Sequence, residues 1–130
     1  MKLEVGMYIR YKGLNYDCPI IQKITKLETP GRCGGKYKVF TNKTNGWFID
    51  SDYIEMEVKG NRIPQPSFNI VDLIEVGDYV NGYYVEDISK TFINVATGSN
   101  YFQSPTIYEQ DIKSIVTKEQ FEQMEYKVGE

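Results

Sequence analysis

The fold is decided by the stretch Leu3-Glu4-Val5-Gly6-Met7-Tyr8-Ile9, which returns 71 positions later as Ile74-Glu75-Val76-Gly77-Asp78-Tyr79-Val80. In the first copy, apolar side chains alternate with polar ones, and a period of two is typical of a half-buried β-strand. Three further segments recur in the same order: residues 21–26 as 85–90, 37–41 as 93–97 and 51–54 as 109–112. Four matches in one order indicate an internal duplication.

The duplication predicts a first repeat at residues 1–60, a linker at 61–70 with two prolines, and a second repeat at 71–130. Short β-rich runs follow the opening strand of the first repeat at residues 20–25, 36–41, 46–49 and 53–58. Turn-forming pairs separate such runs, among them Gly34-Gly35, Asn45-Gly46 and Asn81-Gly82. Five short strands in so small a unit predict a mainly β protein made of two tandem small SH3-like β-barrel repeats.

The C-terminal end departs from the repeat pattern. The residues Thr117-Lys118-Glu119-Gln120 fit a capping box, and Phe121 and Met124 lie three apart on one helical face. We therefore expect a short C-terminal helix whose apolar face packs on the second barrel, followed by a closing strand at residues 126–128.

The composition excludes several classes of site. Histidine is absent from the 130 residues, and Cys18 and Cys33 are the only cysteines. A structural zinc site needs four Cys or His ligands, and a nucleophile is commonly activated by an imidazole. The spacing of the two cysteines matches no redox or metal motif, so we expect free thiols. The sequence predicts a protein that is not an enzyme and that holds no metal and no cofactor.

Paired carboxylates are the remaining candidates for catalysis. Asp50 with Asp52, and Glu55 with Glu57, alternate along a predicted strand, so that each pair shares one face. Because Asp and Glu side chains are mostly exposed, we expect both pairs to be solvated.

The location of the protein is suggested by what its sequence lacks. The first residues carry no apolar run of the kind found in signal peptides, and no stretch is long enough to span a membrane. We therefore expect a cytoplasmic protein without a membrane partner.

Three segments carry a resemblance to known proteins: DLIEVGDYVNG (72–82), IKSIVTKEQF (112–121) and the opening MKLEVGMYIR (1–10). At both ends and in the second repeat, the chain resembles small proteins encoded by clostridial phages and prophages. The resemblance does not extend over residues 11–68. The resemblance implies an origin in a mobile element and action in a host cell. Accessory phage proteins of this size often block a host defence protein or capture the nucleotide signal that a defence uses.

The net charge of −3 conceals an asymmetry between the halves. Residues 1–65 hold eleven basic and seven acidic residues, a balance of +4, whereas residues 66–130 hold four basic and eleven acidic residues, a balance of −7. Such asymmetry favours an anionic ligand on the basic side.

Basic, aromatic and glycine residues gather in the first repeat. Glycines allow backbone N–H groups to approach an anion, Lys and Arg supply charge, and aromatic rings can stack a base. The predicted ligand-binding residues are Arg32, Lys36, Tyr37, Lys38, Lys43 and Trp47. No Walker motif accompanies them. A glycine-rich hairpin with solvated lysines and a core tryptophan is the alternative interpretation.

Acidic residues supply the corresponding hypothesis for the second repeat. Its predicted partner-binding residues are Asp78, Glu86 and Asp87. An acidic surface can imitate DNA phosphates and occupy the basic groove of a host protein, or it can serve solubility alone. The acidic repeat of one molecule binding the basic repeat of another, which would give a homo-oligomer, is a third alternative.

The sequence thus favours a non-enzymatic binding protein of phage or prophage origin that counteracts a host defence system. Its partner would be a host defence protein that it occludes or an anionic nucleotide that it sequesters. A nucleic-acid-binding module that acts through the basic first repeat is the alternative.

Overall fold

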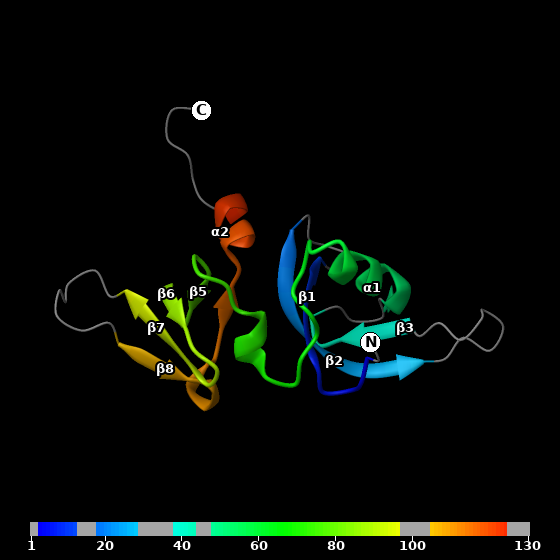
Figure 1. Ribbon diagram of the computed structural model, residues 1–130, viewed down its shortest axis with the longest axis horizontal. Helices are drawn as coiled ribbons and strands as arrows, with labels where there is room; N and C mark the ends of the chain where they lie inside the picture. The colour runs from blue at the N-terminus through cyan, green and yellow to red at the C-terminus, as the bar shows by residue number, and fades with distance from the viewer. Residues whose placement is uncertain (1–2, 13–17, 29–37, 44–47, 97–104, 125–130) are drawn as a thin grey trace. The chain divides into compact units, whose positions relative to one another are not determined.

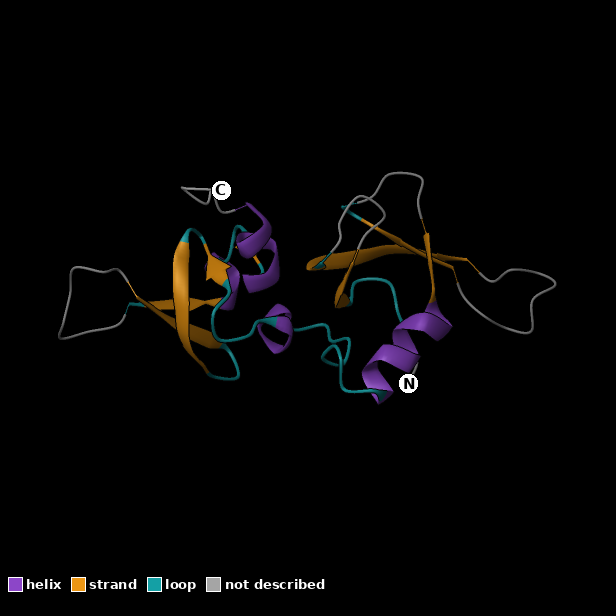
Figure 2. Cartoon of the chain, turned by 90° about the horizontal axis from the view of Figure 1, so that it is seen from above, coloured by secondary structure: helices purple, strands orange, loops and turns teal. Residues whose placement is uncertain are grey.

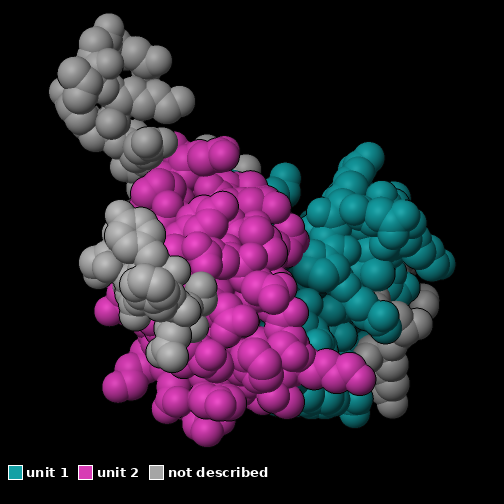
Figure 3. Space-filling view, turned by 60° about the vertical axis from the view of Figure 1, so that its left-hand side comes forward, with its two compact units in different colours: residues 1–73 teal, residues 74–130 magenta. Residues whose placement is uncertain are grey.

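The computed structural model describes residues 3–12, 18–28, 38–43, 48–96 and 105–124 (Figure 1). The chain divides into two compact units, unit 1 (Met1–Leu73) and unit 2 (Ile74–Glu130), which Figure 3 colours separately. Each unit is mainly β and contains one antiparallel sheet. In the described part of the chain, no helix has both the length and the apolar composition needed to cross a membrane.

Unit 1 is a four-stranded sheet in which each strand pairs with the next along the chain, and helical segments follow it (Figure 2). Its elements are β1 (Tyr8–Lys12), β2 (Pro19–Glu28), β3 (Lys38–Thr41), β4 (Phe48–Asp50), the helix α1 (Ser51–Lys59) and the 3₁₀ helix η1 (Ile70–Leu73). Its core combines residues from three strands, from α1 and from the loops: Ile9, Ile24 and Val39, then Ile54, then Leu3 and Ile63.

The predicted strand at residues 53–58 is wrong, because these residues form most of α1. Ile54 and Val58 are four residues apart and therefore share a helical face. Ile54 is fully buried, and Val58 packs against the core of unit 1. The apolar residues at 54, 56 and 58 fit an alternating pattern too, but Met56 is exposed. Glu55 and Glu57 do not share one strand face either, because helical residues two apart point in different directions. Asp50 ends β4 and Asp52 lies in α1, so this pair does not lie on one strand as expected.

The end of α1 carries a signal that distinguishes the helix from a strand. Asn61 has a φ of 60°, a left-handed conformation that Asn adopts more readily than most residues. The Arg62 N–H donates to the Glu57 carbonyl at 3.0 Å, and the Asn61 N–H donates to the Val58 carbonyl at 3.0 Å. These two bonds form a Schellman motif, which satisfies carbonyls that the helix end leaves unpaired.

Residues 61–73 pack against the rest of unit 1. Ile63 belongs to its core, and Ser67 exchanges two backbone hydrogen bonds with Tyr8 of β1, at 2.7 and 3.1 Å. Arg10 is 1% exposed, and its guanidinium donates to the Leu73 carbonyl at 3.0 Å. The segment that follows α1 therefore lies against the first strand of the unit.

Unit 2 is a five-stranded sheet in the order β8-β7-β6-β5-β9 (Figure 1). Its elements are β5 (Tyr79–Val80), β6 (Tyr83–Ile88), β7 (Phe92–Ala96), β8 (Thr106–Tyr108), the 3₁₀ helix η2 (Glu109–Asp111), β9 (Ile115–Val116) and the helix α2 (Lys118–Met124). The central strands bury Val80, Val85, Ile93 and Val95 completely.

Two local predictions for unit 2 are confirmed. Asn81 and Gly82 form the two-residue turn between β5 and β6, with φ values of 52° and 86°, the positive pair that a type I′ hairpin requires. Thr117 caps α2, because its Oγ1 accepts the Gln120 N–H at 3.1 Å. The strand predicted at residues 126–128 lies outside the described residues. The Cys18 side chain is buried, and Cys33 lies outside the described part.

Candidate functional site

The predicted ligand-binding residues of the first repeat lie largely outside the described part of the chain. Arg32, Lys36, Tyr37 and Trp47 all fall there. Lys38 begins β3 and is half-buried, while Lys43 follows the strand and is exposed. The Lys43 N–H donates to Thr41 Oγ1 at 3.4 Å. The anion site therefore stays a prediction.

Of the three predicted partner-binding acids, Asp78 does not lie on the surface. Its side chain is completely buried, and its carboxylate oxygens accept the backbone N–H groups of Glu75 and Lys118, each at 2.8 Å. Asp78 therefore holds the turn before β5 in place. Glu86 and Asp87 are exposed on β6, as the predicted acidic binding surface requires.

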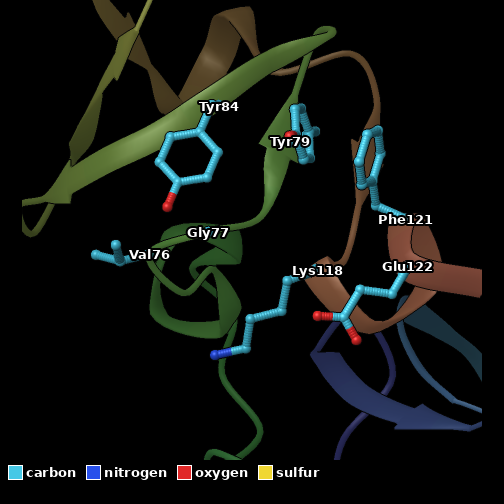
Figure 4. Close-up of a pocket in the computed structure, with 7 residues that line it drawn as sticks. All are labelled: Val76, Gly77, Tyr79, Tyr84, Lys118, Phe121 and Glu122. Atoms are coloured by element: carbon cyan, nitrogen blue, oxygen red, sulfur yellow. The ribbon is translucent and has the colours of Figure 1, made fainter. Parts of the chain in front are cut away.

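The described part of unit 2 contains a shallow aromatic cleft of about 390 Å³ (Figure 4). It lies where the turn before β5, the strands β5 and β6, and the start of α2 meet. Three rings, an aliphatic side chain, a glycine and two charged side chains line it: Tyr79, Tyr84, Phe121, Val76, Gly77, Lys118 and Glu122. We call this the aromatic cleft.

The rings of the aromatic cleft contact one another in a defined geometry. Tyr79 stacks on Phe121 with ring centroids 4.2 Å apart and an interplanar angle of 21°. Tyr84 meets Tyr79 nearly edge to face, at 5.7 Å and 78°. Figure 4 shows the Tyr79 ring between the other two. Tyr84 is 42% exposed and Phe121 is 37% exposed, so solvent reaches aromatic surface in the cleft.

The backbone around the cleft is held by hydrogen bonds from residues far apart in sequence. Asp78 accepts the N–H of Lys118, the first residue of α2, which ties the helix to the turn before β5. Gly77 has a φ of 100°, a conformation that glycine adopts without strain. A Cβ atom there would lie 3.4 Å from the Lys118 side chain, an ordinary contact distance, so the backbone conformation rather than space favours glycine at this position.

Charged groups surround the aromatic cleft. Lys118 Nζ lies 2.9 Å from Glu75 Oε1, and the two side chains are 42% and 39% exposed. Such an exposed ion pair contributes about 0–1 kcal/mol to stability. Its clearer effect is to hold the Lys118 side chain beside Gly77. Glu122 contributes a second carboxylate, and its residue is exposed.

Sequence reasoning missed the cleft, although two signals pointed to it. Tyr79 belongs to the repeated segment, and Phe121 was expected to pack the helix on the barrel. The stacking of these two rings agrees with that packing. The position of Tyr84 opposite Tyr79 follows from the pairing of β5 with β6, which no single motif reveals.

Within the described residues, no group of three or more His, Cys, Asp or Glu side chains is placed to hold a metal ion. Comparisons with protein-family models, with curated proteins and with solved structures find no match to this chain.

Proposed function

We propose that the chain is a non-enzymatic binding protein that docks a partner protein through the aromatic cleft of unit 2. The observation that carries the proposal is a cluster of three partly exposed rings on an acidic unit, in which Tyr79 packs against both Tyr84 and Phe121. Aromatic residues are enriched at the centres of protein interfaces, where they bury a large area at a small cost in conformational entropy. The lack of histidine in the whole sequence favours binding over acid–base catalysis.

We also propose that both units are SH3-like and arose by duplication. In unit 2, four strands form a meander, a 3₁₀ helix follows, and the fifth strand returns to pair with the first. This order is typical of SH3-like barrels. In unit 1, the Tyr8–Ser67 bridge supports a comparable return, because Tyr8 and Tyr79 occupy the same place in the repeated segment and Tyr79 pairs with Val116.

The partner that we propose is a host defence protein with a basic surface. Residues 74–130 hold ten acidic and four basic residues, and complementary charge speeds association and suppresses wrong partners. The resemblance of both chain ends to clostridial phage and prophage proteins supports a role against host defence, in the host cytoplasm. Occlusion of such a protein would need no chemistry from this chain.

A capture experiment with a matched pair of variants tests the proposal. The tagged full chain is incubated with lysate from a clostridial host, and the binding of any captured protein is then measured with purified material. Phe121→Ala should weaken binding at least about 30-fold, as expected when a hot-spot residue worth about 2 kcal/mol is truncated. Tyr108→Ala is the control, because Tyr108 is 49% exposed on β8 and does not line the cleft. Equal loss in both variants would contradict the proposal.

Sequestration of a nucleotide signal and binding of nucleic acid through the basic first repeat are the competing functions. Thermal-shift measurements with cyclic nucleotides, and DNA and RNA binding at low and high salt, distinguish them from protein docking. Stabilisation by a nucleotide, or nucleic-acid affinity that falls steeply with salt and is lost in Lys36→Glu/Lys38→Glu, would favour these alternatives.

A further inference from the structure

The turn before the first strand has the same hydrogen bonds in both units. In unit 1, the Gly6 N–H donates to the Ile24 carbonyl at 2.9 Å, and the Ile24 N–H donates to the Met7 carbonyl at 2.8 Å. In unit 2, the Gly77 N–H donates to the Val85 carbonyl at 3.1 Å, and the Val85 N–H donates to the Asp78 carbonyl at 2.8 Å. The two glycines have φ values of 98° and 100°.

These bonds identify equivalent positions in the two units. By hydrogen bonding, Ile24 of β2 corresponds to Val85 of β6, and each precedes a β-bulge. Alignment of the sequence alone equates Ile24 with Ile88, three residues further on. The structural correspondence also places Lys23 where unit 2 has Tyr84.

The residue opposite the repeated tyrosine differs between the units. Tyr8 pairs with Lys23 across β1 and β2, whereas Tyr79 pairs with Tyr84 across β5 and β6. Directly opposite residues on antiparallel strands point to the same face of the sheet. In unit 1 the Lys23 ammonium lies over the Tyr8 ring, 5.8 Å from its centroid. Unit 1 therefore covers its own tyrosine with a cation, and unit 2 has a third ring in that place.

We propose that the aromatic cleft of unit 2 binds a cationic side chain of the partner protein, an arginine guanidinium, whereas unit 1 covers the equivalent tyrosine with its own cation, Lys23. This inference rests on the proposed docking function of the cleft. Electron-rich ring faces attract a cation, and the attraction grows when the site is shielded from water. Glu122 lines the same cleft and provides a carboxylate for the guanidinium.

Charge on unit 2 favours a cationic occupant over an anionic or neutral one. Glu75 neutralises the ammonium of Lys118, and Glu122 then leaves the cleft with a negative balance. Further acidic side chains, Glu86 and Asp87, are exposed on β6. A planar guanidinium can stack on a ring and form two parallel hydrogen bonds with a carboxylate, which an ammonium cannot.

The test compares two peptides that differ only in charge. Acetyl-Gly-Arg-Gly-Arg-Gly-amide and its citrulline counterpart have nearly the same shape, but citrulline is neutral. Each is titrated into the full chain, with NMR detection of the ring protons of Tyr79, Tyr84 and Phe121. We expect the arginine peptide to shift these signals and to bind about tenfold more tightly than the citrulline peptide, since cation–π and carboxylate contacts are together worth about 1.4 kcal/mol.

A single substitution converts the cleft to the arrangement of unit 1. Tyr84→Lys places the chain's own ammonium opposite Tyr79, as Lys23 lies opposite Tyr8, and should weaken arginine-peptide binding about tenfold. Tyr108→Lys is the matched control, because it makes the same change at an exposed tyrosine outside the cleft and should leave binding unchanged. Retained hydrogen-exchange protection at Val85 shows that unit 2 stays folded.

Three results would overturn the inference: equal binding of the two peptides, no perturbation of the three rings by either peptide, or equal effects of the two lysine variants. Each leaves the docking function testable by itself. If Phe121→Ala loses partner capture but the parent chain binds the two peptides equally, the docking proposal stands and the inferred preference for a cation fails. Unchanged capture in Phe121→Ala would instead remove the docking function.

Discussion

The carboxylate of Asp78 accepts the backbone N–H of Lys118 at 2.8 Å across forty positions of the chain. Its other oxygen accepts the N–H of Glu75 at 2.8 Å. One buried side chain therefore connects the turn before β5 with the first residue of α2. Because both ends of this connection carry residues of the aromatic cleft, Asp78 determines whether the rings of β5 and α2 meet.

Asp78→Asn should destabilise unit 2 by about 2 kcal/mol, because the amide can accept only one of the two N–H groups and turns its own NH₂ toward the other. The stacking of Tyr79 on Phe121 should weaken with it. The free energy of unfolding in guanidinium chloride and the ring-proton shifts of Phe121 measure the two effects. Glu86→Gln makes the same chemical change at an exposed site and should stay within about 0.5 kcal/mol of the parent.

Asn81 performs two tasks, which two substitutions separate. Its positive φ suits the turn, and its side chain accepts the Lys113 and Ser114 N–H groups at 2.8 and 3.1 Å and donates to the Asp111 carbonyl at 2.9 Å. Asn81→Gly keeps the backbone freedom and loses only the side-chain bonds. Asn81→Ala loses both.

We expect Asn81→Gly to cost about 1–2 kcal/mol for the lost bonds, and Asn81→Ala about 1 kcal/mol more for the strained φ. Thermal unfolding of both variants measures the difference. If Asn81→Gly unfolds like the parent, the side-chain bonds to the segment before β9 contribute nothing to stability.

Arg10 should be needed for the stability of unit 1 even though it is charged. Its guanidinium is buried and donates to the Leu73 carbonyl. Arg10→Ala removes packing atoms and leaves that carbonyl without this donor, which should cost about 3 kcal/mol. Lys12→Ala, at an exposed position of the same strand, should change stability by less than about 0.5 kcal/mol. Hydrogen exchange at Ile24 and Val39 reports the loss within unit 1, and similar values for both variants would contradict this role of Arg10.

Tyr11 should make unit 1 sensitive to alkali. Burial against the core raises the pKa of its phenol above the usual 10.0, and the charges of Glu57 and Tyr53 raise that pKa further. The unfolded chain therefore loses this proton at a lower pH than the folded chain. The stability that neutral Tyr11 contributes is fully present below pH 10 and is lost as the pH rises through the raised pKa of the folded state.

Tyr11→Phe should reduce the drop in unfolding free energy between pH 8 and pH 11, as measured by denaturant titrations at several pH values. Tyr83→Phe is the control, because Tyr83 is 46% exposed. A parent protein and a Tyr11→Phe variant with the same pH profile would rule out the contribution of Tyr11.

Strand periodicity and turn chemistry were predictable from the sequence because they are local. The Asn81-Gly82 turn and the Thr117 cap depend on neighbours within a few residues. The strand predicted from the alternation at the opening of the first repeat is wrong before Tyr8, because Val5 and Gly6 form a turn there and Val5 is 54% exposed. The helix α1 was missed because Ile54, Met56 and Val58 fit a period of two as well as a helical face. The Gly60-Asn61 pair after it marks a helix end, and this signal distinguishes the two.

Long-range pairing explains the other differences. Asp78 and Arg10 are charged residues that a sequence pattern places in water, yet each is buried because a backbone group far along the chain pairs with it. The aromatic cleft has the same origin, since the β5–β6 register brings Tyr84 to Tyr79, and α2 brings Phe121. No spacing rule connects residues that meet only through such pairings.

In each unit, residues near the start of the unit are completed by partners near its end, and this affects the order in which the nascent chain folds. Unit 1 needs Ser67 and Leu73 to complete its contacts with β1, and both are synthesised before most of unit 2. Unit 2 needs Lys118, forty positions after Asp78, to satisfy the Asp78 carboxylate. Because domains generally fold as units during synthesis, N-terminal first, unit 1 can fold on the ribosome while unit 2 waits for Lys118 to emerge.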